Sequence, residues 1–372
     1  MQRTKETVKK IGLIKENLSK KFLEREDIIE GILISLIANT NVLLIGPPGT
    51  GKSALVNSIV KHISNSQHFQ WLLTRFTTPE EIFGPVNLKE LENGKYKRNT
   101  DNKLPLADVA FLDEVFKANS AILNSLLTLI NERVFYNDGG AETSPLLSVI
   151  GASNEYPEDE ELGALFDRFL LRYEVDYIGE DQSFLAMLQG GVAQSKVLIS
   201  IEEINELSEA AEFINIPAAV LNSLITVRQE LKKEGMRPSD RRFRQCLNLL
   251  RVKALLDDRA AVEPKDLLIL KDVLWEEPEQ MKDVQEIILE HATDPITKML
   301  QSFQNDANEL WTYAQQGTQE SIETIEKYKR ILNELQDALK NNPNRESEIK
   351  PVIEQFSNAL RQLTNVALGI SN

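Results

Sequence analysis

The chain has 372 residues, enough for two or three domains, and its 42% hydrophobic and 27% charged residues are typical of a globular protein. A formal net charge of -15 argues against binding to nucleic acid through a broad basic surface. A single cysteine excludes an internal disulfide, and no membrane-spanning apolar run or N-terminal signal sequence is present, so we expect a cytoplasmic protein.

The first chemical motif follows two amphipathic helices predicted within residues 1–38. An apolar run of strand length, 42–45, breaks into a glycine-rich turn, and a helical pattern opens directly after it. The turn matches the phosphate-loop template G-x-x-x-x-G-K-S/T, whose glycines let backbone N–H groups face a phosphate. It consists of Gly46, Pro47, Pro48, Gly49, Thr50, Gly51, Lys52 and Ser53, with Ala54 next in the helix. We therefore predict that Lys52 contacts the β- and γ-phosphates of a nucleotide and that Ser53 ligates Mg2+.

A pair of acids at the end of an apolar strand is the second motif. A buried parallel strand at 109–112 has no reason to end in two carboxylates unless something beyond the sheet needs them. We predict that Asp113 holds the Mg2+ shell and that Glu114 polarises the attacking water. Before this strand, residues 84–108 carry turn signals such as Asn93-Gly94, which indicate a hairpin or loop.

Two later polar residues give weaker signals. A strand predicted at 148–153 ends in Asn154, which could orient the hydrolytic water or touch the γ-phosphate, although asparagine also simply ends strands. Arg168 stands in a mostly apolar segment. It is either a structural, ion-paired residue or a group that projects toward a neighbouring subunit's phosphate, and the spacing leaves both open.

The pattern is only helical from about residue 201. A compact helical unit is predicted to end near 274. Beyond it, apolar residues recur at heptad spacing, and they predict helices packed antiparallel around a turn at 341–344. These residues include Ile349, Phe356, Leu363 and Ile370. Such helices could dock a protein or only bury one another.

The order of these features resembles that of the AAA+ ATPases. The stretches TRFTTPEEIFGP at 74–85, FLDEVFKA at 111–118, ILNSLLTLINER at 122–133 and ASNE at 152–155 are similar to the MoxR family, most closely to its RavA subfamily. The resemblance covers roughly residues 10–275. It implies an α/β P-loop AAA+ module, in which helices flank a parallel sheet, with an all-α lid and a C-terminal helical bundle or hairpin.

The same resemblance implies a domain organisation. The αβα nucleotide-binding core is expected at 1–192, the all-α lid at 193–275 and the C-terminal helical domain at 276–372. Within the core we expect a helix-2 insert at about 83–107 and a presensor-1 hairpin at about 133–147. RavA-type proteins carry a small β-rich insertion in their helical region, whereas only helices are expected here after 276. Partners that use that insertion are therefore not carried over.

Individual residues also receive roles from the resemblance. Asn154 becomes sensor 1, Arg168 the arginine finger that serves the next subunit, and Arg241 the sensor 2 arginine. Sensor 2 would tie the angle of the lid to the nucleotide state. Arg172 and Arg242 are the fallback candidates for the finger and for sensor 2.

Together, these residues and the resemblance predict an ATPase that binds ATP/ADP and Mg2+, forms a homohexameric ring and remodels a protein client. A von Willebrand factor A domain partner follows from the family alone. One alternative is a nucleic-acid motor, but Lys89, Lys95 and Lys97 of the first hairpin are interleaved with acids. The other is a nucleotide-gated scaffold with little turnover, which would not need Glu114.

Overall fold

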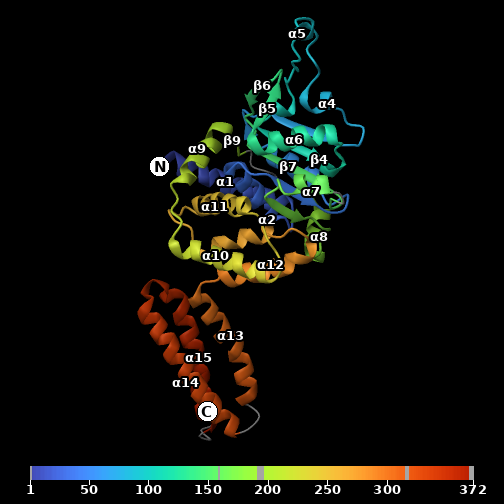
Figure 1. Ribbon diagram of the computed structural model, residues 1–372. Coiled ribbons are helices and arrows are strands. Elements are labelled where there is room, and N and C mark those ends of the chain that lie inside the picture. Colours follow the sequence, from blue (N-terminus) through green and yellow to red (C-terminus); the bar gives the residue numbers. More distant parts are fainter. Residues whose placement is uncertain (1, 158–159, 191–196, 315–317, 368–372) are drawn as a thin grey trace. The chain divides into compact units, whose positions relative to one another are not determined.

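The computed structural model describes residues 2–157, 160–190, 197–314 and 318–367 of the protein. The chain forms two compact units, the first ending at His291 and the second beginning at Ala292 (Figure 1). The boundary expected at 192/193 between core and lid lies outside the described residues.

A five-stranded parallel sheet with the order β3-β4-β7-β1-β8 lies at the centre of the first unit and confirms the predicted α/β class. The strands are β1 (Val42–Ile45), β3 (His68–Leu72), β4 (Val109–Asp113), β7 (Ser148–Ser153) and β8 (Leu171–Glu174). Strands β4, β7 and β1 are almost wholly buried, as expected of central parallel strands. Because they are neighbours and point the same way, the three predicted motifs end at one edge of the sheet.

Helices pack on this sheet, and α2 connects it to the lid. Those of the core are α1 (Gln2–Lys21), α2 (Glu26–Ala38), α3 (Lys52–Val60), α4 (Pro79–Phe83), α6 (Ser120–Glu132), α7 (Glu160–Phe166) and α8 (Asp181–Gln189), with 3-10 turns η1 (Leu104–Leu106) and η2 (Val115–Lys117). Helix α2 is buried almost all round, which is typical of a helix without a solvent face. It contacts β1, β7 and β8 on one side and the lid on the other.

The lid is helical, and one short parallel pair of strands joins it to the core. Its helices are α9 (Ile201–Glu212), α10 (Ala218–Lys233), α11 (Asp240–Leu256) and α12 (Met281–Ala292), with 3-10 segments η3 (Pro264–Asp272) and η4 (Pro278–Gln280). A short parallel pair, β2 (Ile63–Ser64) with β9 (Ile199–Ser200), joins the lid's start to the core. Val284 and Ile288 of α12 are fully buried and His291 bonds Glu230 at 2.8 Å. The sequence-based boundary at 275/276 therefore falls inside the first unit.

Two segments project together from one end of the first unit (Figure 1). One is the insert, which holds the short helix α5 (Leu88–Glu92) rather than a plain hairpin because Asn87 caps two backbone N–H groups there. The other is the antiparallel hairpin of β5 (Val134–Asn137) and β6 (Gly140–Thr143). The Asn137 amide accepts from the Arg98 N–H at 2.7 Å and donates to the Arg98 carbonyl at 3.3 Å. The two segments are thus joined by direct hydrogen bonds.

The second unit is a three-helix bundle of α13 (Pro295–Ala314), α14 (Thr318–Asn341) and α15 (Glu346–Ala367), with the 3-10 turn η5 (Pro343–Arg345). Its core includes Tyr328, Leu335, Ile349, Phe356 and Leu363, so the heptad pattern predicted the buried face. Ile370 lies outside the described residues. No helix in the described part of the chain is long and apolar enough to cross a membrane.

The lid–core contact contains a buried carboxyl group, Asp272. Burial raises its pKa to about 7, and repulsion by Asp27 adds to this against the attraction of Lys271. Folded chains therefore keep this proton up to about pH 7, whereas unfolded chains lose it near pH 3.8. Because the folded state binds more protons between these values, stability falls as pH rises through this window.

We expect Asp272→Asn to remove this loss of stability, which is at most about 4 kcal/mol in the free energy of unfolding. The melting temperature of the variant should rise relative to wild type as the pH increases from 4 to 8, as followed by circular dichroism. The exposed Asp258→Asn serves as the control. A difference between Asp272→Asn and wild type that does not change with pH would contradict the assignment.

Candidate nucleotide-binding and hydrolysis site

The phosphate loop joins β1 to the start of α3, as predicted. Its backbone needs glycine at two places. Gly51 has a φ of +84° at the N-cap of α3, and a Cβ on Gly46 would lie 2.1 Å from the Val175 carbonyl oxygen. The loop therefore places the N-terminal N–H groups of α3 and the Lys52 side chain around one small volume, which is the arrangement that binds phosphate.

Lys52 is held at the centre of this loop. Its ammonium donates to the carbonyls of Gly46 at 2.5 Å and Pro47 at 2.9 Å, and to Oδ1 of Asn154 at 3.1 Å. Burial lowers the pKa of Lys52, while the charges of Asp113 and Glu114 oppose that shift. A phosphate would supply the negative charge that this buried cation lacks among its bonded partners.

Ser53 and Asp113 meet where α3 begins and β4 ends. The Ser53 hydroxyl donates to Oδ2 of Asp113 at 3.1 Å, so the two oxygens lie close enough to bind one cation. Within the described ranges, no group of three or more His, Cys, Asp or Glu residues could hold a metal ion. A serine hydroxyl and one carboxylate could hold Mg2+, which commonly takes one or two protein oxygens and completes its shell with waters and phosphate.

Glu114 and Asn154 form the second half of the site. Asn154 Nδ2 donates to Glu114 Oε1, so a continuous chain of hydrogen bonds connects Lys52, Asn154 and Glu114. Glu114 adopts a left-handed conformation, with φ +53°, which is uncommon for this residue type and concentrates at functional sites. Its other oxygen, Oε2, is buried without a hydrogen-bond partner in the described structure, and Lys117 Nζ lies 3.7 Å away. That oxygen therefore has an ion pair with Lys117 but makes no hydrogen bond within the described residues.

A cavity of about 390 Å³ opens beside the phosphate loop. One end is formed by Gly49, Thr50, Gly51 and Lys52, and the other walls are largely apolar. The apolar walls come from Phe22, Leu23, Leu55, Val175, Ile178, Phe184 and Met187. Tyr177 closes one side and donates from its hydroxyl to the Pro48 carbonyl at 3.2 Å. Lys21 and Arg25 also line the cavity, so a flat aromatic base could lie against the apolar walls with its phosphates in the loop.

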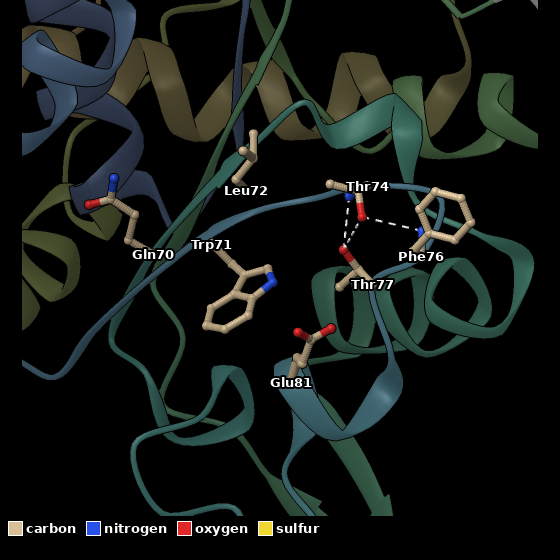
Figure 2. A pocket seen from close by; sticks show the side chains of 7 residues that line it. All are labelled: Gln70, Trp71, Leu72, Thr74, Phe76, Thr77 and Glu81. Atoms are coloured by element: carbon tan, nitrogen blue, oxygen red, sulfur yellow. Dashed lines mark hydrogen bonds between the residues drawn. The ribbon is translucent and has the colours of Figure 1, made fainter.

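The loop after β3 lies at the same edge of the sheet. The Leu73 N–H donates to the Asp113 carbonyl at 2.8 Å, and Asn119 donates to the Thr77 carbonyl at 2.7 Å. Figure 2 shows Thr74 and Thr77 bonded across the loop, beside an open pocket of about 690 Å³ that Trp71 and Glu81 also line. This scaffold holds Phe76 outward, with 90% of its surface exposed.

Of the four candidate arginines, two are buried, Arg168 is partly exposed and Arg241 is exposed. Arg172 and Arg242 are 1% and 2% exposed and bond to backbone carbonyls, so neither can reach out to a ligand in this conformation. Arg168 is partly exposed, and Arg241 bonds Oδ1 of Asn131 at 2.5 Å. Burial, and then the positive charge of Arg168, lower the pKa of Arg241. Neither lines the cavity beside the phosphate loop.

Comparison with known proteins decides the family. The family model described as "MoxR domain in the MoxR-vWA-beta-propeller ternary systems" matches residues 9–209, more than half of the chain. The chain belongs to the MoxR family of AAA+ ATPases. A second model, described as an AAA lid domain, matches residues 219–288.

This MoxR protein is also similar to individual known proteins. Two uncharacterized proteins of Methanocaldococcus jannaschii are 42% and 39% identical, over 73% and 77% of this chain and 73% and 75% of their own length. The protein named Chaperone MoxR1 of Mycobacterium tuberculosis is 24% identical over 67% of this chain and 70% of its own. A crystal structure from Cytophaga hutchinsonii, of a protein proposed to be an ATPase, shares the fold, with a TM-score of 0.64 and 17% identity. The match covers 78% of this chain and 96% of the chain from Cytophaga hutchinsonii.

The structure brings together some predicted site residues of this MoxR protein and adds others. Lys52, Ser53, Asp113, Glu114 and Asn154 surround one volume. The sequence analysis assigned all five to one nucleotide site, and the strand order brings them together. The cavity walls were missed because, apart from Leu55 of α3, the apolar residues come from the segment after α1, the segment after β8, and α8, which no local motif connects. The role of Asp167 beside the arginines was missed as well, since a lone aspartate in an apolar segment gives no signal.

Proposed function

We propose that this protein hydrolyses ATP with Mg2+ at sites shared between neighbouring subunits of a ring, and that it uses this reaction to remodel a protein client. The observation that carries the proposal is the bonded chain from Lys52 through Asn154 to Glu114, beside the Ser53–Asp113 pair. A nucleotide-gated scaffold with little turnover needs the phosphate loop to bind the nucleotide. It does not need a carboxylate such as Glu114 that can activate water.

Each group has a distinct task in the proposed reaction. Lys52 and the loop N–H groups would hold the β- and γ-phosphates, while Ser53 and Asp113 would hold Mg2+, which neutralises charge on the phosphates. Oε2 of Glu114, which makes no hydrogen bond within the described residues, would take a proton from the attacking water. Asn154 bonds both Lys52 and Glu114, so it would orient the carboxylate relative to the γ-phosphate.

The partly exposed Arg168 and the exposed Arg241 support a shared site. Neither of them lines the cavity beside this chain's own phosphate loop. We infer that both serve the ATP bound by the next subunit in a ring, which the family resemblance suggests has six members. The outward Phe76 and the half-exposed Leu72 lie at the sheet edge that such a neighbour would cover, and apolar groups of this kind favour association.

The client and partner rest on weaker support. The projecting insert and hairpin expose Leu88, Leu91, Tyr96 and Tyr136, which suit contact with apolar protein segments. The matched family model names systems that also contain von Willebrand factor A proteins, so we propose such a protein as the partner. RavA-like membership remains a prediction.

Lys52→Ala tests the proposed reaction. Wild-type protein should release phosphate from ATP only when Mg2+ is present, and Lys52→Ala should lose both ATP binding and turnover. Phosphate release and binding of a fluorescent ATP analogue measure the two effects. Retention of wild-type turnover by Lys52→Ala would reject the site.

The nucleic-acid alternative needs a separate test. Filter binding with DNA or RNA in the presence of ATP should show no retention for a protein remodeller. Retention that collapses as salt is raised would instead favour a nucleic-acid motor.

A further inference from the structure

Asp167 connects three arginines at the contact between core and lid. Its Oδ2 accepts from Arg168 Nη1 at 3.3 Å, and its Oδ1 accepts from Arg242 Nη2 at 2.6 Å. Arg172 Nη2 lies 3.9 Å from the same Oδ1. One carboxylate therefore holds the proposed finger with one oxygen and a buried arginine of the lid with the other.

The two buried arginines depend on this carboxylate. Arg172 stacks 3.9 Å from the centroid of the Phe166 ring and donates to the Trp275 carbonyl at 2.5 Å. Burial and the positive charge of Arg242 lower the pKa of Arg172 well below its ordinary value, and Asp167 opposes this shift. Because two buried cations repel one another, the carboxylate between them stabilises this arrangement.

The same contacts tie the lid to the finger. Arg242 stands on α11 of the lid and also donates to the Val273 carbonyl at 2.8 Å. A shift of α11 would move Arg242, then Asp167, and with it the guanidinium of Arg168. The Nε of Arg168 is buried and, within the described residues, has no hydrogen-bond partner. Arg168 is thus oriented by Asp167 while part of its donor capacity is unused.

We propose that Asp167 is a positioning residue that orients Arg168 toward the neighbouring subunit's ATP, and that Arg242 makes this orientation depend on the lid. The inference rests on the proposed function, because it presupposes that Arg168 acts across a subunit boundary. A purely structural Asp167 would affect folding and every property of its own subunit. A positioning Asp167 affects turnover only at the site that its subunit completes for a neighbour.

Asp167→Asn tests this difference, because it keeps the shape and removes the charge. We expect turnover to fall about 10- to 100-fold, the effect of a misplaced catalytic group, while the affinity of the isolated subunit for ATP is unchanged. Asp257→Asn is the matched control, since Asp257 also pairs with an arginine, Arg259 at 2.9 Å, and has similar exposure. It should keep wild-type turnover.

Mixing variants then locates the defect. In rings assembled from Asp167→Asn and Lys52→Ala subunits, an intact phosphate loop can meet an intact finger, so activity should return to about a quarter of wild type under random mixing. Arg168→Ala mixed with Lys52→Ala provides the reference. If neither mixture regains activity, the shared site itself is wrong.

Two other results would overturn the positioning role alone. One is recovery by the Arg168→Ala mixture but not by the Asp167→Asn mixture, and the other is wild-type turnover by Asp167→Asn. Should Asp167→Asn fail to fold, Arg242→Lys keeps the buried charge but lacks the planar fork whose two terminal nitrogens donate separately to Val273 and Asp167. It should show the same loss of turnover and the same recovery on mixing, and a failure to show them would equally reject the proposal.

Discussion

Glu114→Gln is expected to slow ATP turnover by about 10²- to 10⁴-fold while ATP binding is retained. The carboxylate ends the bonded chain that begins at Lys52, and its Oε2 has no hydrogen-bond partner in the described structure, so it is the group placed to take a proton from water. Glutamine keeps the shape and can still contact Asn154, but it cannot accept a proton. Phosphate release and binding of a fluorescent ATP analogue, measured on the same preparation, separate the two effects.

Glu155→Gln is the matched control for this experiment. Glu155 also faces Lys117, at 3.5 Å, but its carboxylate has no bond to Asn154. Removing that charge should leave turnover within about twofold, as for an ordinary surface change. Equal losses in Glu114→Gln and Glu155→Gln would show that local charge, rather than proton transfer, controls the rate.

Arg168→Ala is expected to reduce turnover by about 10³- to 10⁵-fold in assembled rings, the range known for arginine fingers. ATP binding to a single subunit should not change, because Arg168 is absent from the cavity beside its own phosphate loop. Sedimentation should show normal rings. Steady-state phosphate release against ATP concentration therefore gives a lower kcat with little change in KM.

Arg228→Ala controls for the loss of an arginine. Arg228 lies on α10, pairs with Asp240 at 3.0 Å, and is 62% exposed. It should behave as wild type, because exposed ion pairs contribute little and this one belongs to no proposed site. If Arg168→Ala also kept wild-type turnover, Arg168 would be only the ion-paired residue that the sequence left as an alternative.

The parts of the site that could be predicted are the motifs formed by consecutive residues. The phosphate loop is specified by its glycines and Lys52, and the acid pair by its place after an apolar strand. The parallel sheet then brings these strand ends together without further information, because parallel strands present their carboxyl ends at one edge. Local sequence and a general rule of topology were sufficient here.

The remaining features depend on contacts between distant segments. Arg172 and Arg242 resemble Arg168 and Arg241 in the sequence, and only packing against Phe166, Val273 and Trp275 shows which pair is buried. The cavity walls likewise come from three separate stretches. No periodicity or motif connects such residues, so their roles required the fold.

Turnover per subunit, measured against protein concentration with sedimentation velocity alongside, tests the shared site most directly. A shared site predicts that the rate per subunit rises as rings assemble, because each ATP needs Lys52 and Glu114 from one chain and Arg168 from the next. A rate per subunit that stays the same from monomer to ring would contradict it, since each chain would then be complete by itself.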